Sequence, residues 1–144
     1  MHDIGKIGVP DFIIKKTGKL TNSEWAVMKQ HPKFGYEILD GSKSELMQCA
    51  RDIAYCHHEK WDGSGYPRGL VGEDIPLSAR IVAIADVYDA LRSDRPYKTA
   101  WSHKESLEFI KNKAGSFFDP YLVDSFIKRQ VEIESISVEL ADDD

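Results

Sequence analysis

The amino-acid sequence predicts an all-α fold built as a single domain. Apolar residues recur with the three-and-four spacing of a helix face over several stretches of the chain. Thr21 and Ser102 are each followed three residues later by a glutamate, the capping-box arrangement that begins a helix. With 144 residues, 42% hydrophobic and 30% charged, the chain can bury one core and has an ordinary globular composition.

Three helices are expected in the first half of the chain. The first begins at the Thr21 cap, and the second begins near Pro32, which suits a first helical turn, and ends at Gly41. The third covers roughly 44–57, where apolar and small residues share one face. By contrast, the glycines and β-branched residues of 6–19 indicate an irregular segment or a short hairpin.

The second half is expected to hold a loop followed by further helices. The glycines and proline of 59–75 interrupt any periodic pattern and predict a loop. A long helix over 76–93 has apolar residues around most of its circumference, so we expect it to be central and buried. A helix over 102–114 follows, and Asp119 with the proline after it begins a last one.

The charge and the hydropathy of the chain limit which partners it can bind and which cellular compartment it can occupy. The net charge of −5, from 19 basic and 24 acidic residues, argues against a broad nucleic-acid surface and thus against DNA as a partner. The longest apolar run, Ile81–Ala85, is too short to cross a bilayer. Cys49 and Cys56 lie about 10 Å apart along one predicted helix, too far for a disulfide, and are expected to be buried free thiols. We therefore expect a cytoplasmic protein without a membrane segment in this chain.

Histidines and one aspartate are the candidate metal ligands. A single histidine is more often a core or surface residue than a ligand, but four of the five here fall at predicted helix ends or beside irregular segments. Neighbours in a regular helix point about 100° apart, so His57 and His58 could share a target only at a helix end. Asp86 lies within the apolar 76–93 helix, where a buried carboxylate requires a metal, an ion pair with Arg80 or Arg92, or a narrow exposed stripe.

Three stretches resemble the signature of one protein family. Residues 2–6 read HDIGK, residues 57–67 read HHEKWDGSGYP, and residues 94–98 read DRPYK. They resemble the HD-GYP family, the branch of the HD phosphohydrolase superfamily that degrades cyclic di-GMP in bacteria. The resemblance implies an HD-domain-like helical bundle with a long glycine-rich loop. It assigns 1–130 to that domain and 131–144 to a C-terminal extension with an acidic tail.

Carried over by position, the resemblance implies a site with two divalent transition-metal ions, Fe or Mn. Asp3 would bridge the ions, and together they would lower the pKa of a bridging water. Lys6, close to Asp3, would contact a phosphate oxygen or transfer a proton, so Asp3 and Lys6 are the expected catalytic residues. The implied metal ligands are His2, Asp3, His31, His57, His58 and Asp86.

The resemblance also implies how substrate and partners bind. Tyr66 would stack on a guanine, and Arg95 and Lys98 would hold phosphates. The 59–75 loop would also contact GGDEF domains, which make cyclic di-GMP, while Trp61 and Asp62 would brace that loop.

Two departures from the family pattern bear on activity. Family members carry helices before the His-Asp motif that supply a further metal-binding histidine, so an N-terminally incomplete domain is expected here. The first metal would then be weakly held, hydrolysis reduced, and exposed apolar surface covered in a homodimer. Arg92 replaces a small residue of the family, and either a carboxylate partner or solvent would suit it.

The leading hypothesis is a metal-dependent phosphodiesterase that hydrolyses cyclic di-GMP in bacterial second-messenger signalling. The first alternative is a catalytically impaired module that binds cyclic di-GMP or a GGDEF partner. The second is an HD phosphohydrolase acting on another nucleotide, which Tyr66, Arg95 and Lys98 disfavour.

Overall fold

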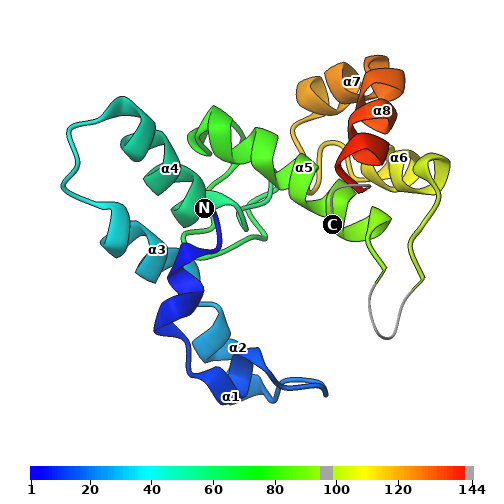
Figure 1. Ribbon diagram of the computed structural model, residues 1–144. Coiled ribbons are helices and arrows are strands. Elements are labelled where there is room, and N and C mark those ends of the chain that lie inside the picture. Colours follow the sequence, from blue (N-terminus) through cyan, green and yellow to red (C-terminus); the bar gives the residue numbers. More distant parts are fainter. Residues whose placement is uncertain (95–98, 142–144) are drawn as a thin grey trace.

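The computed structural model describes residues 1–94 and 99–141, and within these residues the chain is helical and forms no β-strand. This confirms the all-α prediction. In chain order (Figure 1) the elements are the 3₁₀ helix η1 (Ile4–Gly8), α1 (Asp11–Ile14), α2 (Asn22–Met28), α3 (His31–Leu39), α4 (Glu45–Cys56), the 3₁₀ helix η2 (Gly72–Asp74), α5 (Leu77–Arg92), α6 (His103–Asn112), α7 (Pro120–Lys128) and α8 (Gln130–Ala141).

The predicted helix starts follow from local capping. The Thr21 hydroxyl accepts the backbone N–H of Glu24 at 3.3 Å, and the Ser102 hydroxyl accepts that of Glu105 at 3.2 Å. In both boxes the glutamate carboxylate accepts the N–H of the capping residue in return. Both capping boxes expected from the sequence are therefore present.

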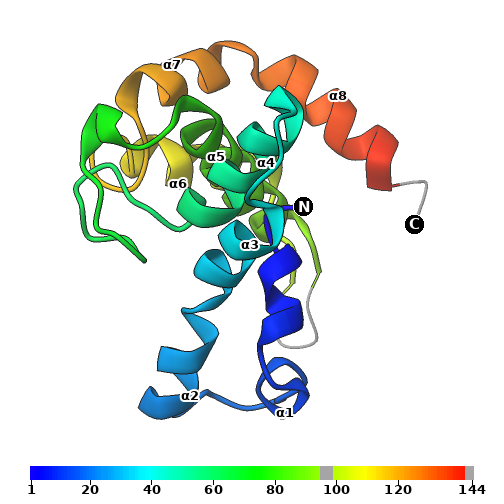
Figure 2. The ribbon, with the colours of Figure 1, turned by 90° about the vertical axis from the view of Figure 1, so that its left-hand side faces the viewer.

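Buried apolar residues form separate groups along the molecule. One group joins α5, α6 and α7 with the turn before α7, and its buried members are Ile84, Tyr88, Leu107, Ile110, Phe118 and Val123. A smaller group joins α3 and α4 through Leu39, Ala50 and Ala54, with Ile4 of η1 packed against it. The short helices α1 and α2 lie at the far end from α7 and α8 in both views (Figure 1 and Figure 2).

The segment 6–19 holds the end of η1 and the short helix α1, joined and followed by irregular residues, so the hairpin alternative for it was wrong. η1 lies directly on α3, because a Cβ at Gly5 would meet the carbonyl oxygen of His31 and the backbone nitrogen of Gly35. The two glycines thus allow a backbone-to-backbone approach that no larger residue permits. This packing fixes the residues before η1 against the start of α3.

The burial of α5 also differs from the expectation. Ala79, Ile84, Tyr88 and Leu91 are buried, but Leu77 and Ile81 are about half exposed, at 54% and 49%. α5 therefore packs against α4 through Ala79 and against α6 and α7 through Ile84 and Tyr88, and it is not buried around its whole circumference. No helix in the described part of the chain has both the length and the hydropathy of a transmembrane span.

Two further details correct or extend the sequence analysis. Both cysteines are free, as expected, but only Cys56 is buried, because Cys49 lies on the outward side of α4. The C-terminal segment forms α8, a helix that was not predicted. Its apolar residues Val131, Ile133, Ile136 and Val138 follow intervals of two and three, which do not make a helical stripe.

Candidate metal centre

Three histidines from two helix ends meet in one cluster. His31 begins α3, His57 caps the end of α4, and His58 is the next residue. One ring nitrogen from each lies within 4.8 Å of those of the other two. The chain leaves α4 at His57, so two neighbouring rings turn toward a shared centre, as the sequence analysis expected of adjacent histidines.

Main-chain carbonyls set the orientation of two of these rings. The Nδ1 atom of His31 donates to the carbonyl oxygen of Met28 at 2.8 Å, and that of His57 to the carbonyl oxygen of Ala54 at 3.0 Å. The neutral rings therefore carry their proton on Nδ1 and a lone pair on Nε2. The two Nε2 atoms lie only 3.3 Å apart, so two lone pairs face the same space. This donor set fits a divalent transition-metal ion, with the carbonyls as the outer partners that orient each ligand.

The Asp3 carboxylate lies between this cluster and a second group of side chains. Its Oδ1 atom is 3.5 Å from Nε2 of His31 and 3.8 Å from Nε2 of His57. Its Oδ2 atom accepts a hydrogen bond from Lys6 at 2.7 Å and lies 3.5 Å from Nε2 of His2. The two oxygens thus face different donor groups, which is the arrangement that a bridging carboxylate requires.

Asp86 reaches the second group from α5. Its Oδ1 atom lies 3.5 Å from Nε2 of His2, so the residues before η1 reach α5 at this point. Of the alternatives that the sequence left open for this carboxylate, burial with an arginine partner is wrong: the side chain is 38% exposed, because this side of α5 faces the candidate site. Arg80 instead pairs with Asp119 at 2.7 Å, and Arg92 donates to the carbonyl oxygen of Trp101 at 2.9 Å.

Burial and neighbouring charges set the protonation of the cluster. Burial, reinforced by the adjacent histidines, lowers the pKa of His57 to about 4 and that of His58 to about 3. Burial also lowers the pKa of His31. Burial would raise the pKa of Asp3, but the hydrogen bond and charge of Lys6 outweigh it and hold that pKa below its ordinary value. At neutral pH the cluster therefore offers neutral imidazoles and an ionised carboxylate, the forms that bind metal.

The glycine-rich loop after His58 is held by a buried glutamate that the sequence analysis did not single out. The Glu59 carboxylate accepts the backbone N–H groups of Arg68 at 2.7 Å and Leu70 at 3.0 Å, and the residue is only 3% exposed. Gly65 allows the loop to turn back, since a Cβ there would meet the backbone of residues 58–60. The sequence did contain a signal for this role, because Glu59 follows the histidine pair directly and precedes the glycines of the loop.

Trp61 and Asp62 brace the other side of the loop through their backbone. Their N–H groups donate to the carbonyl oxygens of Phe117 at 3.1 Å and Ser116 at 2.9 Å. The Asp62 carboxylate also accepts the N–H of Ser64 at 2.9 Å. The loop is therefore tied to the turn before α7.

Tyr66 connects the glycine-rich loop to the histidine cluster. Its ring stacks on that of His58 with 4.8 Å between centroids and 22° between planes, and its N–H donates to the His58 carbonyl oxygen at 3.1 Å. Burial, with the charge of Asp3, raises the pKa of Tyr66 to about 12. His58 covers one face of the ring, and the Lys29 ammonium lies over the ring at 5.8 Å from its centroid.

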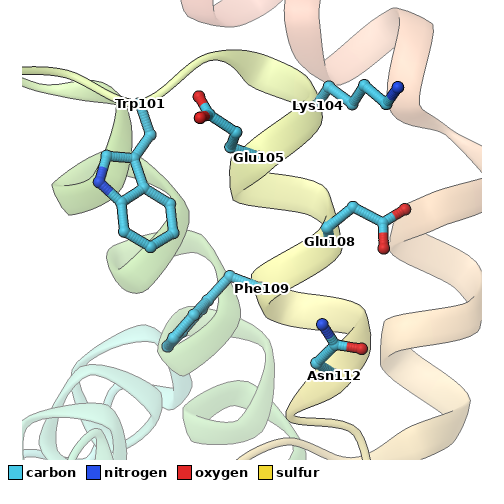
Figure 3. Close-up of a pocket in the computed structure, with 6 residues that line it drawn as sticks. All are labelled: Trp101, Lys104, Glu105, Glu108, Phe109 and Asn112. Atoms are coloured by element: carbon cyan, nitrogen blue, oxygen red, sulfur yellow. The ribbon is translucent and has the colours of Figure 1, made fainter.

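The remaining candidates lie elsewhere. Arg95 and Lys98 fall outside the described residues. The fifth histidine, His103, bonds through Nδ1 to the Tyr88 hydroxyl at 2.7 Å, between α5 and α6. A hollow of about 520 Å³ lies beside α6 (Figure 3) and contains none of the candidate ligands. Its lining residues are Trp101, Lys104, Glu105, Glu108, Phe109 and Asn112.

Several known proteins are similar in sequence to this chain over nearly its whole length. A family model described as HD domain matches residues 1–122. The chain is 52% identical over 94% of its length to the cyclic di-GMP phosphodiesterase response regulator RpfG of Xanthomonas campestris pv. campestris. It is 49% identical over 99% of its length to the 3'3'-cGAMP-specific phosphodiesterase 2 of Vibrio cholerae, and 46% identical over its full length to a cyclic di-GMP phosphodiesterase of Thermotoga maritima.

These relatives are much longer than this chain, which covers 36%, 27% and 39% of their respective lengths. A solved structure of a cyclic GMP-AMP specific phosphodiesterase from Vibrio cholerae shares the fold. The TM-score is 0.54 at 20% identity, and the match covers 89% of this chain and 33% of that one. The expected HD-domain-like fold is thereby confirmed. From its helical fold, the matching family model and relatives at about half identity, the chain belongs to the HD domain family, in its HD-GYP branch.

Proposed function

We propose that this chain is a metal-dependent phosphodiesterase domain that hydrolyses cyclic di-GMP to a linear dinucleotide or GMP. The observation that carries the proposal is the 3.3 Å approach of the His31 and His57 Nε2 atoms beside the Asp3 carboxylate. The relatives from Xanthomonas and Thermotoga, which are named cyclic di-GMP phosphodiesterases, support cyclic di-GMP as the substrate. The relative from Vibrio named for 3'3'-cGAMP supports a cyclic dinucleotide more broadly.

In this proposal the site holds two divalent ions, Fe or Mn. His31, His57 and His58 would hold one ion, His2 and Asp86 would hold the other, and Asp3 would contribute to both. Imidazole and carboxylate ligands suit both metals. Such ions supply Lewis acidity to a phosphoryl oxygen and lower the pKa of water.

Lys6 has the proposed role of a cation and proton donor beside the reacting phosphate. Its ammonium is 2.7 Å from Oδ2 of Asp3 and about two-fifths exposed, so it can turn toward a ligand. A proton held on Nζ can pass to the departing sugar oxygen, which would otherwise leave as an alkoxide.

Substrate binding is assigned to Tyr66 with Arg95 and Lys98. A guanine would stack on the Tyr66 face turned away from His58, with the Lys29 side chain displaced from its place over that ring. The two cations suit phosphate oxygens. Tyr66 is placed for this task by its stacking on His58.

We also propose partners, an oligomeric contact and a compartment for the domain. The exposed outer part of the 59–75 loop, including Asp62 and Ser64, is available to a GGDEF-domain partner. Exposed apolar residues of α5, Leu77 and Ile81, suit a homodimer contact. Cyclic di-GMP signalling would place the domain in the cytoplasm.

The direct test is an assay of the chain with Mn²⁺ or Fe²⁺ under reducing conditions. Cyclic di-GMP and 3'3'-cGAMP are supplied separately, and linear products are followed by chromatography. The proposal expects metal-dependent hydrolysis of cyclic di-GMP that stops on addition of a chelator. Binding of cyclic di-GMP without turnover would instead identify a non-catalytic binding module, and preference for 3'3'-cGAMP would correct the substrate.

A further inference from the structure

Two side chains near the end of α2 lie against Tyr66. The Trp25 ring meets the Tyr66 ring edge-on, with 6.3 Å between centroids and 76° between planes. The Lys29 ammonium lies 5.8 Å from the centroid of the same ring. Tyr66 also stacks on His58, so one aromatic side chain separates the Lys29 charge from the histidine cluster.

The backbone holds Lys29 at this place. Lys29 caps α2, and its N–H donates to the Trp25 carbonyl oxygen at 3.0 Å. The neighbouring carbonyl oxygen of Met28 accepts from the His31 ring at 2.8 Å, so the same turn orients a candidate metal ligand. The end of α2 and the metal cluster therefore form one connected unit.

Within the described part of the chain, Lys29 contacts the Tyr66 ring but forms no ion pair with a carboxylate. Neighbouring lysines pair with carboxylates: Lys6 with Asp3 at 2.7 Å, Lys16 with Glu24 at 2.6 Å, and Lys33 with Glu37 at 3.9 Å. Lys29 has no such ion pair among residues 1–94 and 99–141, although it is partly buried. An ammonium without a carboxylate partner beside a candidate phosphodiesterase centre is placed to bind an anion.

A cyclic dinucleotide carries two phosphodiester groups in one ring. Only one of them can occupy the reacting centre at a time, and the other keeps its negative charge beside it. We infer that Lys29 binds this second phosphodiester, with Trp25 and Tyr66 forming the aromatic wall next to it. This inference rests on the proposed function and adds to it a residue that selects cyclic dinucleotides over substrates with a single phosphodiester.

The test compares two substrates in matched variants. Bis(4-nitrophenyl) phosphate has one phosphodiester, whereas cyclic di-GMP has two. The Mn²⁺-loaded chain, Lys29→Met, Lys29→Arg and the control Lys33→Met are assayed on both substrates. Lys33 lies on α3 and is exposed, so Lys33→Met makes the same change of charge outside the proposed contact.

Lys29→Met is expected to lower the ratio of kcat/KM for cyclic di-GMP to that for bis(4-nitrophenyl) phosphate about tenfold, the scale of one charge-assisted contact, mainly through a higher KM. Lys29→Arg is expected to restore most of this ratio, and Lys33→Met to keep it. Equal losses on both substrates, or an unchanged ratio, would overturn the assignment of Lys29 alone. An unaltered chain that hydrolyses the nitrophenyl ester but no cyclic dinucleotide would overturn the proposed substrate, and the inference with it.

Discussion

The Nε2 atoms of His31 and His57 lie 3.3 Å apart, although the Nδ1 atom of each ring already donates to a main-chain carbonyl. In neutral imidazoles this geometry directs two lone pairs into the same space. Two lone pairs repel unless a cation lies between them. The pair is therefore the clearest physical sign of a metal site in this fold, independent of any motif.

Removal of one of these rings should abolish tight metal binding at the cluster. His57→Ala is expected to weaken Mn²⁺ binding by at least about 100-fold, because loss of a ligand costs more than loss of an outer partner. Equilibrium dialysis with elemental analysis measures this. The control is His103→Ala, since His103 bonds to Tyr88 between other helices. Equal metal affinity in His57→Ala and the unaltered chain would rule out His57 as a ligand.

The metal-free chain should lose stability in mild acid. The pKa of His57 is lowered to about 4 and that of His58 to about 3, against 6.5 for an ordinary histidine. Below pH 6.5 the unfolded chain thus binds more protons than the folded one. The stabilisation is complete above pH 6.5 and declines as the pH falls through that value toward 4.

Urea unfolding with a chelator present measures this effect. Between pH about 7.5 and about 5, the free energy of unfolding is expected to fall by roughly 2 kcal/mol or more. His58→Gln should flatten the dependence, because the amide does not titrate in this range. A chain equally stable at both pH values would show that these rings are not buried as neutral groups.

Glu59 should matter for the loop and much less for the metal. Glu59→Gln replaces one of two acceptors with a donor that faces a backbone N–H, so a loss of about 1–3 kcal/mol in stability is expected. The KM for cyclic di-GMP should rise, because Tyr66 lies on the loop that Glu59 anchors. Thermal unfolding and steady-state kinetics measure the two effects. Glu73→Gln, an exposed residue of the same loop, is the matched control.

Gly5 should be essential for placing Asp3. In Gly5→Ala the new methyl group would meet the backbone of His31 and Gly35, which pushes η1 away from α3. Such overpacking is expected to cost about 1–3 kcal/mol and to weaken Mn²⁺ binding. Gly18→Ala is the control, since nothing lies within 4 Å of its added carbon. An alanine at position 5 with normal stability and metal affinity would contradict the close packing of η1 on α3.

Much of the helical layout could be predicted from local sequence. Capping boxes and first-turn prolines depend on neighbouring residues only, so Thr21 and Ser102 marked their helix starts correctly. The position of His57 and His58 at a helix end followed from the geometry of adjacent side chains. The convergence of Asp3, His31 and Asp86 on one place was expected only from the family resemblance, because it depends on long-range packing.

The features that were missed also depend on tertiary contacts. The exposure of Asp86 stayed open, because an apolar helix pattern does not reveal which side of α5 is covered. The role of Glu59 depends on how the loop folds back on itself, and that of Lys29 on the approach of the end of α2 to Tyr66. α8 lacks a helical stripe, so its apolar residues gave no periodic signal.

The central claim is that Asp3 serves a metal-dependent phosphodiesterase site, and the most direct test of it is the rate at which the Mn²⁺-loaded Asp3→Asn variant hydrolyses cyclic di-GMP. The Asp3 oxygens face His31 and His57 on one side and His2 and Lys6 on the other, so the amide leaves only one oxygen for both groups. Asp11→Asn, which alters an exposed carboxylate paired with Lys15, is the control. The account predicts at least about a thousandfold loss of kcat for Asp3→Asn and an unchanged rate for the control. An Asp3→Asn chain that hydrolyses cyclic di-GMP within tenfold of the unaltered rate would contradict it.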